Sequence, residues 1–224
     1  MSLIPWSYSK LKAFETCPKQ FYHVKILKEY PQVETEAMRY GTDVHLACEE
    51  YIRDNKPLPE KYKYVLPSLE ALKRKKGEKL CEYELGLTED LKPCGFKDKD
   101  VWFRGIADLI ILDKDNKLAW VVDYKTGKSA RYADKGQLEL MALAVFIHFP
   151  EIKEVRGGLL FVVCKQLITE TYLLDGDPAK LIDKYTNKFR QMIIASDSGV
   201  WNAKPSGLCR RHCDVVQCVH NGRN

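Results

Sequence analysis

Two apolar segments joined by three polar residues constrain the fold more than any other feature of this sequence. The segment WFRGIADLIILD covers residues 102–113, the segment KLAWVVDYK covers residues 117–125, and the polar residues KDN lie between them. Strands connected by so short a turn pair with each other as an antiparallel hairpin. The sequence therefore predicts a β-sheet built around these two strands.

The second strand of this hairpin carries charged residues where buried side chains are expected. In the stretch VVDYKTGK (121–128), one residue separates Asp123 from Lys125, so both side chains point to the same face of the sheet. If the turn is centred between residues 115 and 116, Asp108 lies directly opposite Asp123. Opposed residues in antiparallel strands have Cβ atoms roughly 4.5–5.5 Å apart. The hairpin therefore predicts two neighbouring carboxylates with an ammonium group beside them.

Two interpretations fit this group of charges. Carboxylates at such a distance repel each other unless one is protonated or a cation lies between them. Two acidic groups and a lysine suit the binding of Mg²⁺ or Mn²⁺ by hard oxygen ligands, and hence the hydrolysis of a phosphodiester. In the alternative, Asp123 and Lys125 form a plain ion pair and Asp108 caps a turn. The hairpin taken alone favours the ion pair.

Three further residues favour a metal site over the plain ion pair. Gly105 lies on the first strand of the hairpin and is interpreted as room for the close approach of a ligand backbone. His45, in GTDVH, is either a surface histidine or an imidazole ligand of the metal. Gln137 begins the helix expected after the hairpin and is placed to contact the lysine or DNA.

The remainder of the chain predicts helices around the sheet. Apolar spacing and turn signals predict helices at residues 7–28 with a break at Pro18, at 37–54, near 67–76, at 134–149, and from Asp177-Pro178 to about Ser196, with further strands at 81–87, 157–164 and 168–174. This order of elements predicts an α/β fold with a mixed central sheet flanked by helices.

The composition is that of an ordinary globular protein. The chain has 224 residues, of which 45% are hydrophobic and 30% charged, and its formal charge of +5 permits a polyanionic partner without requiring one. No apolar run approaches the ~20 residues of a membrane span, and no secretory signal is visible. We therefore expect an intracellular, cytoplasmic protein with no membrane partner.

The eight cysteines fall into two classes. Four lie among apolar neighbours and are expected to be small buried side chains: Cys48, Cys81, Cys94 and Cys164. The others are Cys17, which stands alone near the N-terminus, and a C-x₃-C-x₄-C group formed by Cys209, Cys213 and Cys218. Clustered thiolates suit zinc or an iron–sulfur cluster, and the nearby His212 and His220 keep zinc open as an alternative.

Five segments in this order resemble the PD-(D/E)XK nuclease superfamily, and within it the RecB-type nuclease domains, the iron–sulfur nucleases of CRISPR spacer acquisition and related phage-encoded exonucleases. The segments are SYSKLKAFETCPKQFYH (7–23), GTDVH (41–45), FRGIADLI (103–110), VVDYKTGK (121–128) and QLELMAL (137–143). One position departs from the family pattern, because Met141 stands where the family often has a tyrosine, four residues after the glutamine.

The resemblance implies a role for each candidate residue. Lys125 would be the catalytic lysine, with Gln137 and a glutamate, Glu82 or its neighbour Glu84, also at the site. The metal ligands, for Mg²⁺ or Mn²⁺, would be His45, Asp108, Asp123 and the backbone carbonyl of Tyr124. The ligands of a 4Fe–4S cluster, with Zn²⁺ as the alternative, would be Cys17, Cys209, Cys213 and Cys218.

The resemblance also implies an organisation and a function. Residues 1–224 would form a single nuclease domain, with 37–196 as its catalytic core and 1–36 with 197–224 as the cysteine region that joins the chain ends. The function expected is a metal-dependent DNA exonuclease acting on linear duplex or single-stranded ends in recombination or repair, of bacterial or viral origin, beside a recombination or annealing protein. The alternatives are an endonuclease, an end-trimming nuclease of the CRISPR type, and a non-catalytic DNA-binding scaffold.

Overall fold

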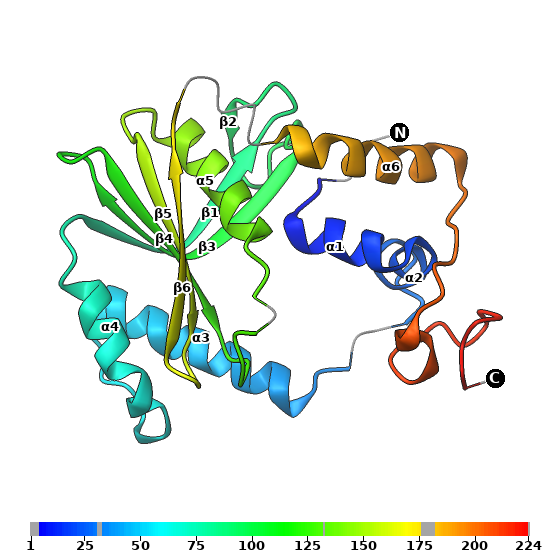
Figure 1. Ribbon diagram of the computed structural model, residues 1–224, viewed down its shortest axis with the longest axis horizontal. Helices are drawn as coiled ribbons and strands as arrows, with labels where there is room; N and C mark the ends of the chain where they lie inside the picture. The colour runs from blue at the N-terminus through cyan, green and yellow to red at the C-terminus, as the bar shows by residue number, and fades with distance from the viewer. Residues whose placement is uncertain (1–4, 31–32, 132, 176–181, 224) are drawn as a thin grey trace. The chain divides into compact units, whose positions relative to one another are not determined.

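The structure, a computed structural model, describes residues 5–30, 33–131, 133–175 and 182–223 (Figure 1). The chain forms two compact units. The larger unit comprises residues 35–182, and the smaller unit combines the chain up to residue 34 with the chain from residue 183 onward.

The larger unit is built on a six-stranded mixed sheet with the strand order β2-β1-β3-β4-β5-β6. All neighbouring strands are antiparallel except β4 and β5, which are parallel. The strands are β1 (Glu78–Leu87), β2 (Pro93–Cys94), β3 (Phe103–Asp113), β4 (Leu118–Lys125), β5 (Glu154–Phe161) and β6 (Gln166–Leu173). The predicted mixed central sheet is confirmed, and the sequence missed only the two-residue strand β2.

The hairpin of β3 and β4 has the register that its turn predicts. Asp113 pairs with Leu118 and Leu109 pairs with Val122, which centres the turn between residues 115 and 116. The pairing of β3 with β4 ends at Leu109 and Val122, although β3 continues beside β1 and β4 continues beside β5. The two central strands therefore part at this point, and we call the opening beyond Leu109 and Val122 the fork.

Helices cover both faces of the sheet (Figure 1). The helices of the larger unit are α3 (Glu36–Asp54), the 3₁₀ helix η2 (Glu60–Val65), α4 (Leu66–Lys73) and α5 (Gly136–His148). Leu160 of β5 packs in one cluster with α3 and α4, whereas Leu159 packs with Leu138 of α5. Because neighbouring residues of a strand point to opposite faces, the sheet lies between two helical layers.

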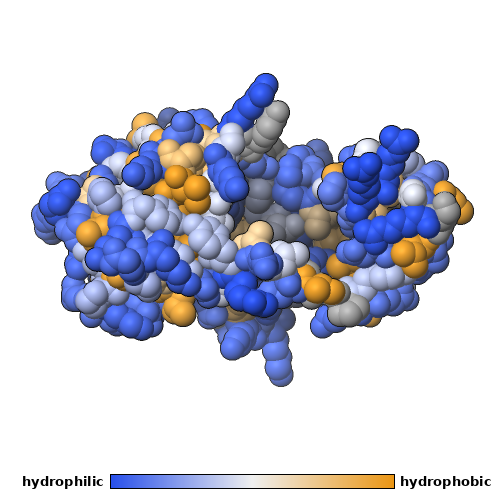
Figure 2. All heavy atoms as spheres, turned by 90° about the horizontal axis from the view of Figure 1, so that it is seen from below, coloured by the Kyte–Doolittle hydropathy of each residue, from blue (hydrophilic) through white to orange (hydrophobic). Residues whose placement is uncertain are grey.

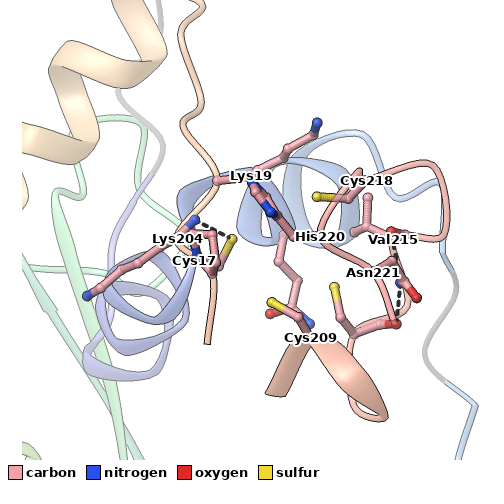
Figure 3. A pocket seen from close by; sticks show the side chains of 12 residues that line it. Cys17, Lys19, Lys204, Cys209, Val215, Cys218, His220 and Asn221 are labelled. Carbon is pink, nitrogen blue, oxygen red and sulfur yellow. Dashed lines mark hydrogen bonds between the residues drawn. The ribbon is translucent and has the colours of Figure 1, made fainter. Parts of the chain in front are cut away.

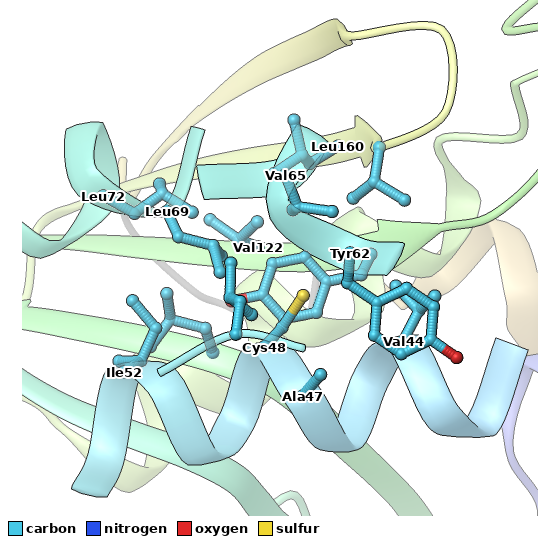
Figure 4. Close-up of a cluster of buried hydrophobic side chains, with 14 of the residues drawn as sticks. Val44, Ala47, Cys48, Ile52, Tyr62, Val65, Leu69, Leu72, Val122 and Leu160 are labelled. Atoms are coloured by element: carbon cyan, nitrogen blue, oxygen red, sulfur yellow. The ribbon is translucent and has the colours of Figure 1, made fainter. Parts of the chain in front are cut away.

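The core between α3 and the sheet positions the helix. Figure 4 shows Val44, Cys48 and Ile52 of α3 directed toward Val122 of β4 and Leu69 of α4. Positions 44, 48 and 52 are four residues apart and so share one helix face. Their burial fixes the rotation of α3 about its axis, and with it the direction of every other side chain on the helix.

Local chemistry sets the ends of α3. The Thr35 side chain accepts a hydrogen bond from the Met38 amide at the N-terminus, and Asn55 ends the helix in the left-handed conformation with φ 57°. Gly41 lies inside α3 and disfavours the helical conformation, since glycine in a helix interior lowers stability by about 1 kcal/mol relative to alanine.

The smaller unit is helical. Its elements are α1 (Tyr8–Thr16), α2 (Pro18–Phe21), the π-helical turn η1 (Tyr22–Ile26), α6 (Asp183–Ser198) and the 3₁₀ turn η4 (Gly207–Arg210). The predicted break at Pro18 is present, and the ring of Trp6 lies 5.1 Å from that of Phe189 on α6. The predicted start of the last helix, at Asp177-Pro178, lies outside the described residues.

The surface is mainly hydrophilic on the face shown in Figure 2, where hydrophobic residues form scattered spots. None of the helices in the described ranges is long and apolar enough to cross a membrane.

Candidate active site

The fork gathers most of the predicted site residues from five elements of the larger unit. They are His45 on α3, Glu82 on β1, Asp108 on β3, Asp123 and Lys125 on β4, and Gln137 on α5.

Asp108 bridges the two parting strands. Its Oδ2 atom accepts a hydrogen bond of 2.6 Å from the amide of Tyr124, and the same oxygen lies 3.4 Å from Nδ1 of His45. The suggestion that Asp108 caps a turn is therefore wrong. The hairpin turn is capped by Asp113, which accepts hydrogen bonds from the backbone and side-chain nitrogens of Asn116.

Glu82 faces Asp108 across the β1–β3 pair. Their neighbours Cys81 and Leu109 pair on one side, and Tyr83 and Ala107 on the other. Glu82 itself has φ 47°, a left-handed conformation that is rare outside glycine and concentrated at functional sites. Ligand atoms of His45, Glu82 and Asp108 all lie within 4.8 Å of one another, a group to which Glu84 does not belong.

Asp123 is buried and contacts both Gln137 and Lys125. Its residue is 8% exposed, and its Oδ1 atom accepts a hydrogen bond of 2.7 Å from Nε2 of Gln137. The Lys125 ammonium lies 2.7 Å from Oδ2 and 3.3 Å from Oε1 of Gln137. Both oxygens of the buried carboxylate therefore have a partner, and the ion pair between Asp123 and Lys125 is present.

The charges at the fork are unbalanced. Burial and the charge of Asp108 raise the pKa of Asp123, and the Lys125 ammonium offsets only part of that shift. Burial and Asp108 also raise the pKa of Glu82. Burial alone would lower the pKa of His45, but its hydrogen bond to Asp108 and the nearby carboxylates raise it. Three carboxylates face one lysine, and hard oxygen ligands of this kind fit Mg²⁺ or Mn²⁺.

Gly105 has a different role from the one that the sequence suggests. A Cβ atom at this position would lie 2.7 Å from Cε and 2.8 Å from Sδ of Met141 on α5. The space at Gly105 is therefore filled by a side chain of the same chain, and the interpretation of Gly105 as room for a ligand is wrong.

The four remaining candidates meet in the smaller unit (Figure 3). One pocket is lined by the cysteines Cys17, Cys209, Cys213 and Cys218 together with His220. The amides of Lys204 and Ser206 donate 3.4 Å hydrogen bonds to the sulfur atoms of Cys17 and Cys209. Burial and the proximity of the other thiols raise the pKa of Cys213. The structure thus brings Cys17, near the N-terminus, together with the three clustered thiols of the C-terminal segment.

Two residues that the sequence analysis missed hold this pocket in shape. Asn221 is buried, and its Nδ2 atom donates to the carbonyls of Cys213 and Val215 at 3.1 and 3.0 Å. Gly222 packs so closely that a Cβ atom there would lie 2.8 Å from Cα of Arg210. The Asn-Gly dipeptide is itself a turn signal, and it could have marked this position.

Comparisons with known proteins identify the family and the fold of the chain. A family model described as the PD-(D/E)XK nuclease superfamily matches residues 5–218. The solved structure of SSO0001 has a TM-score of 0.51 and 15% identity, covering 97% of this chain and 87% of that one. A candidate exonuclease from Eubacterium rectale has a TM-score of 0.53 and 13% identity, covering 92% of this chain and 85% of that one. At these identities the two structures show a shared fold alone. No curated protein matches the chain.

Replacing Glu82 by glutamine should raise the Tm of the protein in the presence of a chelator. The substitution removes one of three crowded carboxylates and keeps the shape of the side chain. Mn²⁺ should raise the Tm of the wild-type protein more than that of the variant, and a ligand at 100 times its Kd stabilises a protein by about 2.7 kcal/mol. Differential scanning fluorimetry with and without Mn²⁺ measures both effects.

Glu84→Gln is the matched control, because Glu84 lies on the same strand outside the group of ligand atoms. It should leave the Tm and the Mn²⁺ shift unchanged. A lower Tm for Glu82→Gln in chelator, or equal Mn²⁺ shifts in the wild type and this variant, would contradict the interpretation of crowded carboxylates.

Proposed function

Because the chain belongs to the PD-(D/E)XK nuclease superfamily, we propose that it is a deoxyribonuclease that uses Mg²⁺ or Mn²⁺ at the fork to hydrolyse phosphodiester bonds at DNA ends. The observation that carries the proposal is the group of His45, Glu82 and Asp108, whose ligand atoms all lie within 4.8 Å of one another. The ion pair of Asp123 with Lys125 is present, but it offsets only part of the rise in the pKa of Asp123 that burial and Asp108 cause. A cation bound among these carboxylates would relieve their repulsion.

The proposed ligands come from separate elements. Oxygen atoms of Asp108 and Asp123 and the carbonyl of Tyr124 would hold the ion, together with His45, and Glu82 lies close enough to contribute. The bound ion would stabilise charge on the scissile phosphate and lower the pKa of a bound water. Asp108 has a second task, because its hydrogen bond to the Tyr124 amide fixes the backbone that presents this carbonyl.

Lys125 and Gln137 would act on the phosphate side of the site. The Lys125 ammonium lies beside the proposed ligand Asp123, where it can stabilise negative charge on the phosphate or position the attacking water. Gln137 contacts both residues, donating to Asp123 and accepting from Lys125. It would therefore hold the lysine in a defined direction when an ion draws Asp123 away.

Action at DNA ends is the finer part of the proposal. It is supported by the likeness in fold to the candidate exonuclease from Eubacterium rectale. The substrate would be linear duplex or single-stranded DNA ends, in recombination or repair, with a recombination or annealing protein as a partner. An endonuclease or end-trimming enzyme of the same fold would use the same site.

We also propose that the cysteine pocket holds a 4Fe–4S cluster that joins the two ends of the chain. Zinc bonded to sulfur at about 2.3 Å in a tetrahedron places the sulfur atoms roughly 3.8 Å apart. Among the described residues, the groups of three ligand atoms within 4.8 Å of one another do not include these thiols. The wider spacing and the two amide donors to sulfur favour a cluster over a single zinc ion.

Asp108→Ala, Asp123→Ala and Lys125→Ala should each lower the rate of DNA cleavage by roughly a hundredfold or more, because each removes charge stabilisation at the phosphate. The assay is digestion of end-labelled linear DNA with Mg²⁺, Mn²⁺ or chelator, and chelator should abolish cleavage. Asp115→Ala is the control, since Asp115 is a carboxylate at the turn end of the same hairpin and pairs with Lys76.

The same assay separates the alternatives. Loss of the linear substrate with an intact closed circle is expected of an exonuclease, and cutting of the circle would indicate an endonuclease. Wild-type protein that binds DNA without cutting it in either metal would favour the non-catalytic scaffold. Unchanged cleavage in any one of the three alanine variants would remove the role proposed for that residue.

Protein purified without oxygen should be brown, with absorbance at about 400 nm and bound iron, as a cysteine-ligated cluster requires. Cys213→Ser should lose the colour and the iron, since it removes one of the four thiols. Cys164→Ser is the control, because Cys164 does not line the pocket. Colourless wild-type protein that contains one equivalent of zinc would contradict the cluster.

A further inference from the structure

The two edges of the six-stranded sheet differ in how they are protected from pairing with another chain. At one edge lies β2, which has two residues and begins with Pro93, and β1 beside it is irregular at Glu82, where φ is 47°. Short strands, prolines and irregular backbone all hinder the addition of a further strand. At the other edge lies β6, whose eight residues pair with β5 without a bulge and include no proline or lysine. Only the β6 edge therefore lacks this protection.

Half of the backbone groups of β6 point away from the sheet. The Leu174 amide donates a 2.9 Å hydrogen bond to the Lys153 carbonyl at the end of the β5–β6 pair, so the even-numbered residues of β6 exchange hydrogen bonds with β5. The amides and carbonyls of the odd-numbered residues consequently face outward. These residues are Leu167, Thr169, Thr171 and Leu173. In the part of the chain that the structure describes, no strand lies beyond β6, and of these groups only the Leu173 carbonyl has a partner, the Asp175 amide.

The side chains of the same residues form an exposed face. Leu167 is 47% exposed, Leu173 is 65% exposed, and the two threonines between them are exposed as well. The other face of β6 is held in place, because Ile168 and Tyr172 pack against the core on the α5 side of the sheet. The strand is thus fixed to its own sheet and presents to the outside both free backbone groups and apolar side chains, which is the arrangement that recruits another strand.

We propose that β6 pairs with β6 of a second copy of the chain, antiparallel about a two-fold axis, so that the two sheets join into one. With the axis at Glu170, Leu167 lies opposite Leu173 of the second copy, and Thr169 lies opposite Thr171 of the second copy. Every outward backbone group then meets an outward group of the other copy, as an antiparallel ladder requires. One surface is complementary to itself, which is the condition for a symmetric dimer.

The charges at the ends of the strand favour a second copy over an unrelated strand. In the same register Lys165, in the turn before β6, lies beside Asp175 of the second copy, just after β6, and the symmetry makes two such pairs. Neither residue has an oppositely charged partner within the described ranges of its own chain. Glu170 meets its own counterpart at the axis, where each carboxylate is already paired with a Lys135 ammonium at 2.6 Å.

The test is the association of the full chain, purified without oxygen, in sedimentation velocity over a wide range of protein concentration. A single pair of strands is a small interface, so a weak and reversible monomer–dimer equilibrium is expected. Lys165→Asp and Asp175→Lys should each weaken the Kd of the dimer by about tenfold, because each variant places like charges at both ends of the strand pair. The double variant should regain the wild-type Kd, since it restores both ion pairs with the charges exchanged.

A second variant tests the apolar face independently of these charges. Leu173→Lys places an ammonium opposite Leu167 of the second copy and should weaken the Kd by about tenfold or more, in the way that lysines protect natural edge strands. Ile194→Lys is the matched control, because Ile194 lies on α6 and is 64% exposed, nearly as much as Leu173. It should leave the Kd unchanged.

Wild-type protein that stays monomeric at every concentration would overturn the inference, and so would a dimer whose Kd is the same in Leu173→Lys. A double charge variant that associates no better than the single variants would overturn the proposed register. The inference does not depend on the proposed nuclease function, because these experiments measure association alone.

Discussion

The parting of β3 and β4 is the constraint on which the rest of the site depends. Each strand keeps its other neighbour, so the sheet continues on both sides while its two central strands separate beyond Leu109 and Val122. A buried amide that loses its strand partner needs another acceptor. The Asp108 carboxylate supplies it to Tyr124, and this bond holds Asp108 between the strands at the open end of the hairpin. The fork is therefore both an interruption of the sheet and the frame of the site.

The packing of helices against the sheet stabilises the larger unit enough to tolerate repelling carboxylates at the fork. Glu82, Asp108 and Asp123 face one another with a single lysine beside them, and the raised pKa values of Glu82 and Asp123 show the resulting repulsion and burial. The hydrophobic core between α3, α4 and the sheet supplies stabilising free energy that offsets this repulsion. The same burial of Val44 and Cys48 fixes the rotation of α3 that brings His45 to Asp108. The burial of one face of α3 thus both stabilises the larger unit and positions His45 at the site.

Several features of the fork could be predicted from the sequence, because they follow from the local geometry of turns and strands. The turn fixed the register of the hairpin, and strand alternation placed Asp123 and Lys125 on one face. The parting of the strands was not predictable in the same way, because it depends on the pairing of β3 with β1 and of β4 with β5. Three other features also depend on contacts between distant parts of the chain. They are the left-handed backbone of Glu82, the hydrogen bond between Asp108 and Tyr124, and the filling of the space at Gly105 by Met141. In the smaller unit Asn221 and Gly222 hold the backbone around Cys213 and Cys209, and a sequence search for metal ligands does not find them. The metal roles and the cluster stay predictions.

The most direct test of a metal site at the fork is an anomalous difference map from a crystal grown with Mn²⁺. A strong manganese peak is expected in contact with the carboxylates of Asp108 and Asp123 and the carbonyl of Tyr124, with the Lys125 ammonium moved from Oδ2 of Asp123. A map without manganese at the fork, in which Lys125 still lies against that oxygen, would contradict the assignment and leave a plain ion pair between the two strands.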